Sequence, residues 1–238
     1  MPSEGIDPTR QPSIDATHVA IDPAILYFGT PVVLIGTENE NRTPNLAPMS
    51  SAWWLGWGCM LGLTSGSKTT ENIRRTGQCV LNLPSTDLAA AVDRLALTTG
   101  SDPVPVYKQA MGFRHVADKF GLARLTPVAS DLVAAPRAAE CPVQLEAEVT
   151  AIHPFGLGNP RIRTEISAIE VRIVRVHVAK SIRVDGDGDR IDSDRWRPLI
   201  MSFRNFYGLG PQVQHSRLGE FPEELFKPVA LRKPKPPA

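Results

Sequence analysis

Hydrophobic and polar residues alternate in several stretches of the chain, a pattern typical of half-buried β-strands. The clearest stretch is VQLEAEVTAI, residues 143–152. Its odd positions from Leu145 to Ala151 are apolar, and its even positions are polar: Gln144, Glu146, Glu148 and Thr150. One apolar face and one polar face predict a half-buried strand of an antiparallel sheet. Short apolar runs predict further strands at residues 31–37, 58–64 and 79–84.

The longest strand pattern covers residues 163–180 and changes phase in the middle. Its apolar residues occupy odd positions up to Ile173 and even positions from Val174 onward. A one-residue slip would turn every following side chain to the opposite face unless an extra residue absorbs it. We therefore expect a β-bulge near Ile173–Val174. Long, bent strands suit a barrel better than a flat sheet.

Helical spacing of apolar residues is confined to short stretches. Residues 85–97 predict a helix capped by Ser85 or Thr86, and residues 69–77 predict a second helix with a threonine cap and Gly77 as its stop. Residues 115–122 are a candidate for a third helix. Because strands are not regularly interleaved with helices, the sequence predicts a mainly β, antiparallel barrel with peripheral short helices. A doubly wound nucleotide-binding fold is not expected.

The domain organisation follows from length and local composition. The chain has 238 residues, 42% of them hydrophobic, and no linker or repeat interrupts residues 22–215, so we expect one domain there. Residues 1–21 are expected to form an N-terminal arm, and residues 216–238 a C-terminal tail rich in lysine and proline. No run of 18 apolar residues occurs, and the N-terminus lacks the pattern of a signal peptide. A cytoplasmic protein is the expectation.

Charge and cysteine content narrow the function classes. The formal net charge is +1, which argues against general attraction to nucleic acids or anionic membranes. Cys59, Cys79 and Cys141 are far apart and form no CxxC pair, so we expect reduced, buried thiols.

The stretch LGLTSGSKTTENI, residues 61–73, has the appearance of a phosphate-binding loop. An NTP-binding P-loop needs a lysine directly after its last glycine, but Ser67 separates Gly66 from Lys68, and Leu61 stands where the first glycine is needed. The P-loop interpretation is therefore excluded. Hydroxyls, a glycine, Lys68 and the free N–H groups of the following helix still favour an anion. An ordinary capped helix with a solvated lysine is the alternative.

This stretch follows NLAPMSS, residues 45–51, and the two together carry a family pattern. Residues 44–84, PNLAPMSSAWWLGWGCMLGLTSGSKTTENIRRTGQCVLNLP, resemble the flavin reductase-like family, the FMN-binding split barrels related to flavoredoxin. Members show Asn-x-Ala-Pro-x-Ser, then a Ser/Thr-rich turn, Lys-Asp-Thr and a helix containing Asn-Ile. A weaker resemblance runs over most of residues 22–210. The family's usual aspartate is Thr69 here.

The resemblance implies a Greek-key, antiparallel split barrel that binds FMN across a homodimer interface. It implies NAD(P)H-dependent reduction of flavin by hydride transfer to N5, with an oxygenase as a candidate partner and no catalytic acid or base. One segment would line the flavin ring: Asn45, Leu46, Ala47, Pro48, Met49, Ser50 and Ser51. A turn would hold the phosphate: Thr64, Ser65, Gly66, Ser67, Lys68, Thr69, Thr70 and Asn72. Tyr207 would lie against the flavin pocket of the partner subunit.

Two other function classes stay open at this point. One is an FMN-binding module or electron carrier without reductase turnover, and the other is a structural dimer that has lost the cofactor.

Three further features have plainer explanations. Residues 185–194, DGDGDRIDSD, fail as a calcium-binding EF-hand loop because Arg190 stands at its sixth position and Trp196 at its twelfth, so we expect a hairpin turn and no metal. The three tryptophans between residues 53 and 57 are expected at a dimer interface or pocket wall. His177 is expected to be exposed on the polar face of its strand.

Overall fold

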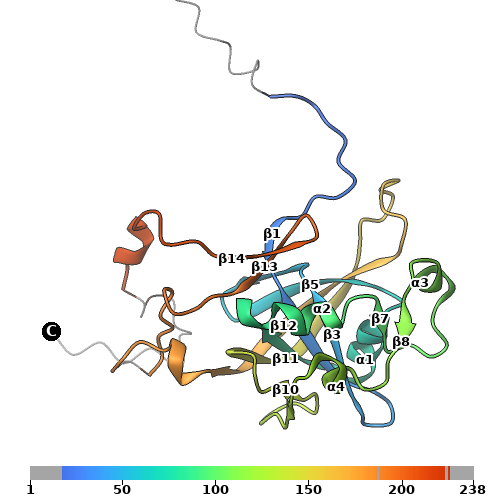
Figure 1. Cartoon of the computed structure of the whole chain (residues 1–238), viewed down its shortest axis with the longest axis horizontal. Helices are drawn as coiled ribbons and strands as arrows, with labels where there is room; N and C mark the ends of the chain where they lie inside the picture. The colour runs from blue at the N-terminus through green and yellow to red at the C-terminus, as the bar shows by residue number, and fades with distance from the viewer. Residues whose placement is uncertain (1–17, 187, 223–224, 226–238) are drawn as a thin grey trace, which may run out of the picture.

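The structure of the chain is a computed structural model that describes residues 18–186, 188–222 and 225. A seven-stranded antiparallel sheet forms its centre (Figure 1). The strand order in the sheet is β3 (Pro44–Met49), β2 (Val33–Glu38), β6 (Gln78–Leu83), β11 (Val143–Phe155), β12 (Ile166–Val178), β5 (Gly58–Thr64) and β4 (Ala52–Leu55). The predicted mainly β, antiparallel fold is confirmed.

The two edge strands of this sheet, β3 and β4, are consecutive in the sequence. Only Ser50 and Ser51 separate Met49 from Ala52. Since two residues cannot span the width of a flat seven-stranded sheet, the sheet must curve until its edges approach each other. β3 and β4 do not pair with each other within the described sheet, so the barrel is split at this point.

The predicted bulge in the long strand is confirmed. In the pairing of β11 with β12, Glu146 faces Arg175 and Ala147 faces Ile173, so that Val174 has no opposite residue. Ile173 before the bulge and Val178 after it consequently both pack in the barrel interior. A second irregularity lies in β11 between Val149 and Ala151.

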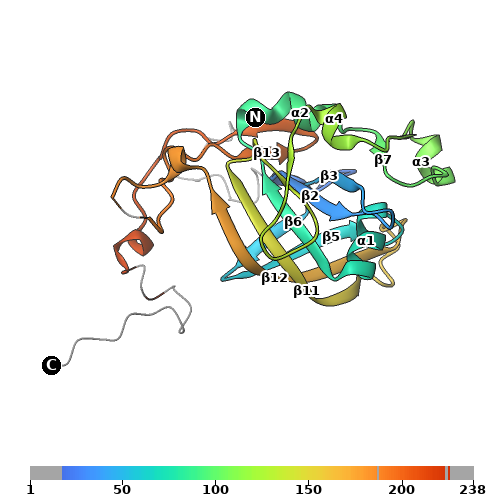
Figure 2. The same cartoon turned by 90° about the horizontal axis from the view of Figure 1, so that it is seen from below.

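The core consists of a barrel interior and an outer layer. The interior is filled by buried side chains from six strands, including Ile35, Leu61, Leu81, Leu145 and Ile169. The outer layer packs α2 (Ala89–Arg94) and α4 (Lys119–Ala123) against the other face of β2 and β3, with Phe120 at its centre. Figure 2 shows α2, α4 and α3 (Val106–Ala110) along one side of the barrel.

Smaller elements complete the fold. β1 (Phe28–Pro31), β13 (Leu199–Ser202) and β14 (Asn205–Gly208) form a three-stranded sheet. Two short pairs are β7 (Thr98–Thr99) with β8 (Arg114–His115) and β9 (Pro127–Val128) with β10 (Arg137–Ala138). Single turns of 3-10 helix lie at Thr86–Leu88, Lys180–Ile182 and Arg217–Glu220.

The structure shortens the predicted helices at residues 85–97 and 115–122. The first becomes a 3-10 turn followed by the six residues of α2, and the second becomes β8 followed by α4. Ser85, one of the two predicted caps, is the N-cap residue of the 3-10 turn, but its side chain makes no capping hydrogen bond.

The prediction that residues 143–152 form a half-buried strand is wrong for its first half. Gln144 and Glu146 point away from the barrel interior but are buried, because residues 129–141 cover that face. Gln144 Nε2 donates to the carbonyls of Ala138 and Cys141, which explains how an amide is accommodated there.

The three cysteines are free and buried, as expected. Arg183 forms an antiparallel bridge with Ile191, and described residues 185, 186, 188 and 189 form a turn between them. Most of the predicted N-terminal arm and of the C-terminal tail lies outside the described residues. No helix among the described residues is both long enough and apolar enough to cross a membrane.

Candidate functional site

Helix α1 (Lys68–Thr76) is set in place by its two ends. Ser67 is its N-cap, and its hydroxyl accepts a hydrogen bond from the Thr70 backbone N–H at 3.2 Å. Gly77 adopts the left-handed conformation and donates its N–H to the Ile73 carbonyl, which confirms it as the stop signal. The predicted threonine cap is wrong, because Ser67 directly precedes the first helical residue, Lys68.

Buried polar side chains connect α1 to strands β2 and β3. Asn45 Nδ2 donates to Thr37 Oγ1 at 3.0 Å and to Thr69 Oγ1 at 3.4 Å. Asn72 Nδ2 donates to the same Thr37 hydroxyl at 3.1 Å and to Asn39 Oδ1 at 2.9 Å. The two segments that carry the family pattern are therefore held together by direct contacts, with Thr37 at their centre.

A cavity of about 330 Å³ lies beside this network. Among the residues that line it are Asn39, Asn45, Lys68, Gly100, Asp102 and His115. The Lys68 side chain is 19% exposed, and its ammonium contacts Glu71 at 3.2 Å. A Cβ atom at Gly100 would lie 2.7 Å from Asn45 Oδ1 and 3.2 Å from Lys68 Cγ, so the absence of a side chain there lets the loop approach.

The other face of the turn at residues 64–67 opens on a second cavity of about 570 Å³. Here Ser65 Oγ lies 2.8 Å from Ser167 Oγ, which also accepts a hydrogen bond from Arg74 at 3.0 Å. Gly66 is exposed, and a Cβ added there would meet no atom within 4 Å. The turn thus presents Lys68 to the first cavity and Ser65 to the second.

The remaining residues of the predicted phosphate turn serve the turn itself. Thr70 is fully buried, and its hydroxyl donates to the Thr64 carbonyl at 2.9 Å. The hydroxyl of Thr69 is buried beside Asn45, and Asn72 Oδ1 is a buried acceptor without a hydrogen-bond partner among the described residues. Thr69, Thr70 and Asn72 are thus buried and hold the backbone of the turn in place, whereas Ser65, Gly66 and Lys68 are partly or fully exposed.

The residues predicted to line a flavin ring take different positions along β3. Leu46 is fully buried in the outer core, whereas Ala47, Pro48 and Met49 are partly buried. Ser50 and Ser51 lie at the split between β3 and β4, where the Ser51 carbonyl accepts the Gly62 N–H at 2.7 Å. Tyr207 lies on β14, is 55% exposed, and lines neither cavity. Its role against a partner subunit stays a prediction.

The groups around the first cavity fit a phosphate ester. Lys68 supplies a cation, and the first N–H groups of α1 lack acceptors within the helix. The amide nitrogens of Asn39 and Asn45 already donate to Thr43 and Thr37, and the carboxylates of Glu40 and Asp102 also line the cavity. The cavity volume falls in the range of small-ligand sites, which begins at roughly 300 Å³. A flavin carrying a terminal phosphate is a ligand of this chemistry.

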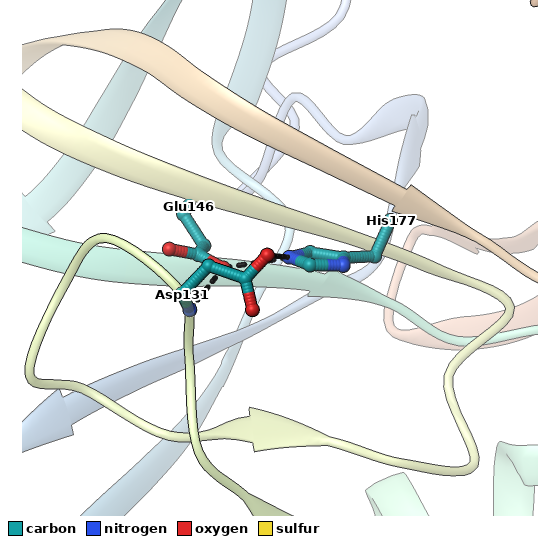
Figure 3. Close-up of side chains that lie close together, drawn as sticks. All are labelled: Asp131, Glu146 and His177. Carbon is teal, nitrogen blue, oxygen red and sulfur yellow. Dashed lines mark hydrogen bonds and ion pairs between the residues drawn. The ribbon is translucent and has the colours of Figure 1, made fainter.

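A third cluster, drawn in Figure 3, lies on the outer face of the barrel, and its three residues line neither cavity. Asp131, Glu146 and His177 place one potential metal-ligand atom each within 4.8 Å of one another. Glu146, however, already accepts hydrogen bonds from His177 Nε2 at 2.6 Å and from two backbone N–H groups, and Arg175 Nε lies 3.8 Å from the Asp131 carboxylate. These contacts fasten the covering loop to the strands. They also correct the expectation that His177 is exposed.

Comparison with known proteins identifies the family of the chain. A sequence model described as the flavin reductase like domain matches residues 25–210. The chain belongs to this flavin reductase-like family. The resemblance seen in residues 44–84 is thereby confirmed.

Among relatives of this flavin reductase-like chain, the uncharacterized protein YdfE of Bacillus subtilis (strain 168) is 38% identical over 193 residues, covering 81% of this chain and 90% of the relative. Flavoredoxin of Desulfovibrio vulgaris (Miyazaki F) matches in structure with a TM-score of 0.68 and 20% identity, over 86% of this chain and all of that chain. Nitrilotriacetate monooxygenase component B from Bacillus cereus matches with a TM-score of 0.62 and 20% identity, over 90% of this chain and all of that chain. The two solved structures support the fold.

Residues 98–117 of this flavin reductase-like chain also contribute to the first cavity, which the sequence patterns did not predict. β7 and β8 pair in parallel, and the Val116 N–H donates to the Thr99 carbonyl at 3.0 Å. This pairing brings Gly100 and His115 to the first cavity. The sequence gives only a weak indication of this contribution. A glycine lies between hydroxyl residues in TTGSD, residues 98–102, and the apolar residues around it have no regular spacing.

Proposed function

We propose that the chain is an FMN-binding oxidoreductase that uses NAD(P)H to reduce flavin. The observation that carries the proposal is that Lys68 and Asn45, from the two segments of the family pattern, line one cavity. Membership in the flavin reductase-like family supports the reaction class.

Each surface residue of the turn has a role in this proposal. Lys68 would hold the terminal phosphate by its charge, in competition with the Glu71 carboxylate that contacts it now. Asn45 keeps α1 and β3 at a fixed spacing through Thr37 and Thr69, so that the backbone of residues 47–51 can lie along a flat ring. Bound flavin supplies the hydride chemistry, and the protein supplies binding and orientation.

We further propose a homodimer, with an oxygenase as a candidate partner. The β4–β5 hairpin carries a patch of three large, exposed apolar side chains. Trp53, Leu55 and Trp57 are 57%, 79% and 45% exposed. Such a patch on a single chain suits a protein interface. One structural neighbour is named as component B of a monooxygenase, which motivates the choice of partner. A cytoplasmic location stays a prediction.

Purified protein tests the main proposal. We expect a bound flavin spectrum with one FMN per chain, and oxidation of NADH or NADPH when FMN is supplied. Tight FMN binding without nicotinamide oxidation would instead favour an electron carrier. Neither flavin binding nor nicotinamide oxidation would favour a structural dimer and overturn the proposal.

A matched pair of variants locates the site. Lys68→Ala should weaken FMN binding by about tenfold or more, since it removes a charge-assisted contact. Lys180→Ala removes an exposed lysine of the 3-10 turn at Lys180–Ile182 and should leave FMN binding unchanged. Equal FMN affinities for both variants would place the phosphate elsewhere.

A further inference from the structure

The two cavities beside the turn at residues 64–67 differ in the charge of their walls. Arg74 and Arg163 line the second cavity together with one carboxylate, that of Glu165. In the first cavity a single lysine stands against two carboxylates. Because anions are attracted to places where cations prevail, the second cavity is the better of the two for a ligand that carries several phosphate groups.

Arg74 is held in place by two serines at the edge of the second cavity. Its Nη2 donates to Ser167 Oγ at 3.0 Å, and its Nη1 donates to the Ser65 carbonyl at 3.4 Å. Ser167 is only 2% exposed, and its hydroxyl lies 2.8 Å from Ser65 Oγ. A guanidinium has five N–H donors, so these contacts order the side chain and still leave donors for a ligand.

Arg163 lies in the loop at residues 156–165, which joins β11 to β12. Its side chain is exposed and makes no hydrogen bond or ion pair with any residue that the structure describes. Arg161, two residues earlier, pairs with Asp22 and does not line the cavity. Of these two loop arginines, Arg163 is therefore the one available to a ligand in the cavity.

Apolar side chains form much of the remaining wall. The cavity measures about 570 Å³, within the range of small-ligand sites. Phe155 lines it and is 56% exposed, so its ring offers a surface on which a flat base can stack. Four aliphatic side chains accompany it: Ile152, Leu157, Ile162 and Ile166. A ligand with both a flat ring and phosphate groups matches this combination.

From this arrangement we propose that the second cavity binds the adenosine half of NADPH, with Arg163 and Arg74 recognising its 2′-phosphate. The inference rests on the proposed function, which makes a nicotinamide dinucleotide the electron donor. The 2′-phosphate distinguishes NADPH from NADH, and guanidinium groups make the bidentate, charge-assisted contacts that a phosphate favours. Lys68 lines the first cavity and Ser65 the second, so a donor in the second cavity would be a neighbour of flavin in the first.

The test compares NADPH with NADH in two variants of the same loop. Arg163→Met removes a charge that lines the cavity, and Arg161→Met removes one that does not. In Arg163→Met we expect the KM for NADPH to rise by about tenfold, with kcat and the KM for NADH unchanged. Arg163→Lys, which restores the charge without the planar fork, should recover part of the loss. Arg161→Met should behave like the unmodified protein.

Several outcomes would overturn the inference. Equal use of NADH and NADPH by the unmodified protein would show that no group recognises the 2′-phosphate. Equal effects of Arg163→Met and Arg161→Met would reduce the role of Arg163 to general surface charge. A loss of affinity for FMN in Arg163→Met, with riboflavin and NADPH unaffected, would assign the second cavity to the flavin phosphate instead.

A binding measurement separates this inference from the proposed function. If the unmodified protein oxidises neither NADH nor NADPH, the proposed function fails on its own. Calorimetry with adenosine 2′,5′-bisphosphate and with AMP then decides on the site. The site stands if the bisphosphate binds about tenfold more tightly than AMP and Arg163→Met abolishes the difference. It falls if the two nucleotides bind equally or if neither binds.

Discussion

Glu146 on β11 and His177 on β12 face each other on the outside of the barrel, with Oε1 and Nε2 2.6 Å apart (Figure 3). The bulge at Val174 makes this contact possible. Before the bulge, odd-numbered residues of β12 such as Ile173 point inward; after it, His177 points outward. The buried Glu146 carboxylate also accepts the backbone N–H groups of Asp131 and Leu132, so one side chain fastens the covering loop to the sheet.

Glu146→Gln should therefore destabilise the fold. The substitution keeps the shape but turns an N–H₂ group toward backbone donors, and we expect a loss of about 1–3 kcal/mol in the free energy of unfolding. Glu148→Gln on the same strand alters only an exposed pair with Arg172 and should cost about 0.5 kcal/mol or less. Urea unfolding at neutral pH measures the stability of both variants. Similar losses in the two would contradict the role of Glu146 in fastening the loop to the sheet.

The effect of Glu146 should depend on pH with a definite sign. Burial opposes ionisation of its carboxyl, but the hydrogen bonds from Asp131, His177 and Leu132 outweigh burial and lower the pKa. A lowered carboxyl pKa gives stability that is present above the pKa of the unfolded chain and is lost as the pH falls through that of the folded chain. The difference between the unmodified protein and Glu146→Gln should shrink below roughly pH 4. A constant difference in acid would argue against an ionised Glu146.

Gly100→Ala should close the first cavity. The new methyl group would lie 2.7 Å from Asn45 Oδ1 and press on the Lys68 side chain, so FMN affinity should fall by about tenfold or more. Gly210→Ala is the matched control, because its methyl group would meet no atom within 4 Å and the residue lines neither cavity. Titration of flavin fluorescence compares the two. If Gly210→Ala weakened binding as much as Gly100→Ala, the cavity assignment would be wrong.

Lys119→Met should change the pH dependence of stability in the ligand-free protein. Burial lowers the pKa of Lys119 from 10.5 to about 8, so the folded protein binds fewer protons than the unfolded chain between these values. The stability of the unmodified protein should consequently rise with pH across this window relative to the variant, by up to ~3 kcal/mol. Unfolding curves at about pH 7 and about pH 10 measure this rise. If the free energy of unfolding changed equally with pH in the unmodified protein and in Lys119→Met, the ammonium of Lys119 would be solvated.

The three thiols should be unreactive in the folded protein. Burial raises the pKa of Cys59, Cys79 and Cys141 to about 12 in each case, which leaves almost no thiolate at neutral pH. A chromogenic disulfide reagent should therefore detect no rapid thiol in native protein and all three after unfolding in urea. Rapid reaction of one thiol in native protein would reveal local opening of the core.

Much of the fold could be predicted from local patterns. The strand at residues 58–64, the bulge at Val174 and the end of α1 at Gly77 each depend on residues close in sequence, and the structure has all three. The burial of Glu146 could not be read in this way, since the loop that covers it is not encoded by the alternation of the strand itself. The same holds for His177.

The candidate site likewise contains residues that the sequence predicts and residues that it does not. The segments at residues 45–51 and 64–72 carry a recognisable pattern, and the structure ties them together through Asn45 and Thr69. Gly100 and His115 come from a stretch of short elements whose positions are set by the parallel pairing of β7 with β8. Such pairing leaves little trace in the spacing of apolar residues.

The strand order also has a consequence for how the chain folds during synthesis. β5 pairs with β12, so that Leu61 finds its partner only when Ile169 has been made. β6 likewise receives β11 late. The N-terminal half can form hairpins as it leaves the ribosome, but the barrel cannot close until the hairpin of β11 and β12 inserts between β6 and β5. Contacts so distant in sequence predict slow folding, during which apolar strand faces stay open to chaperones.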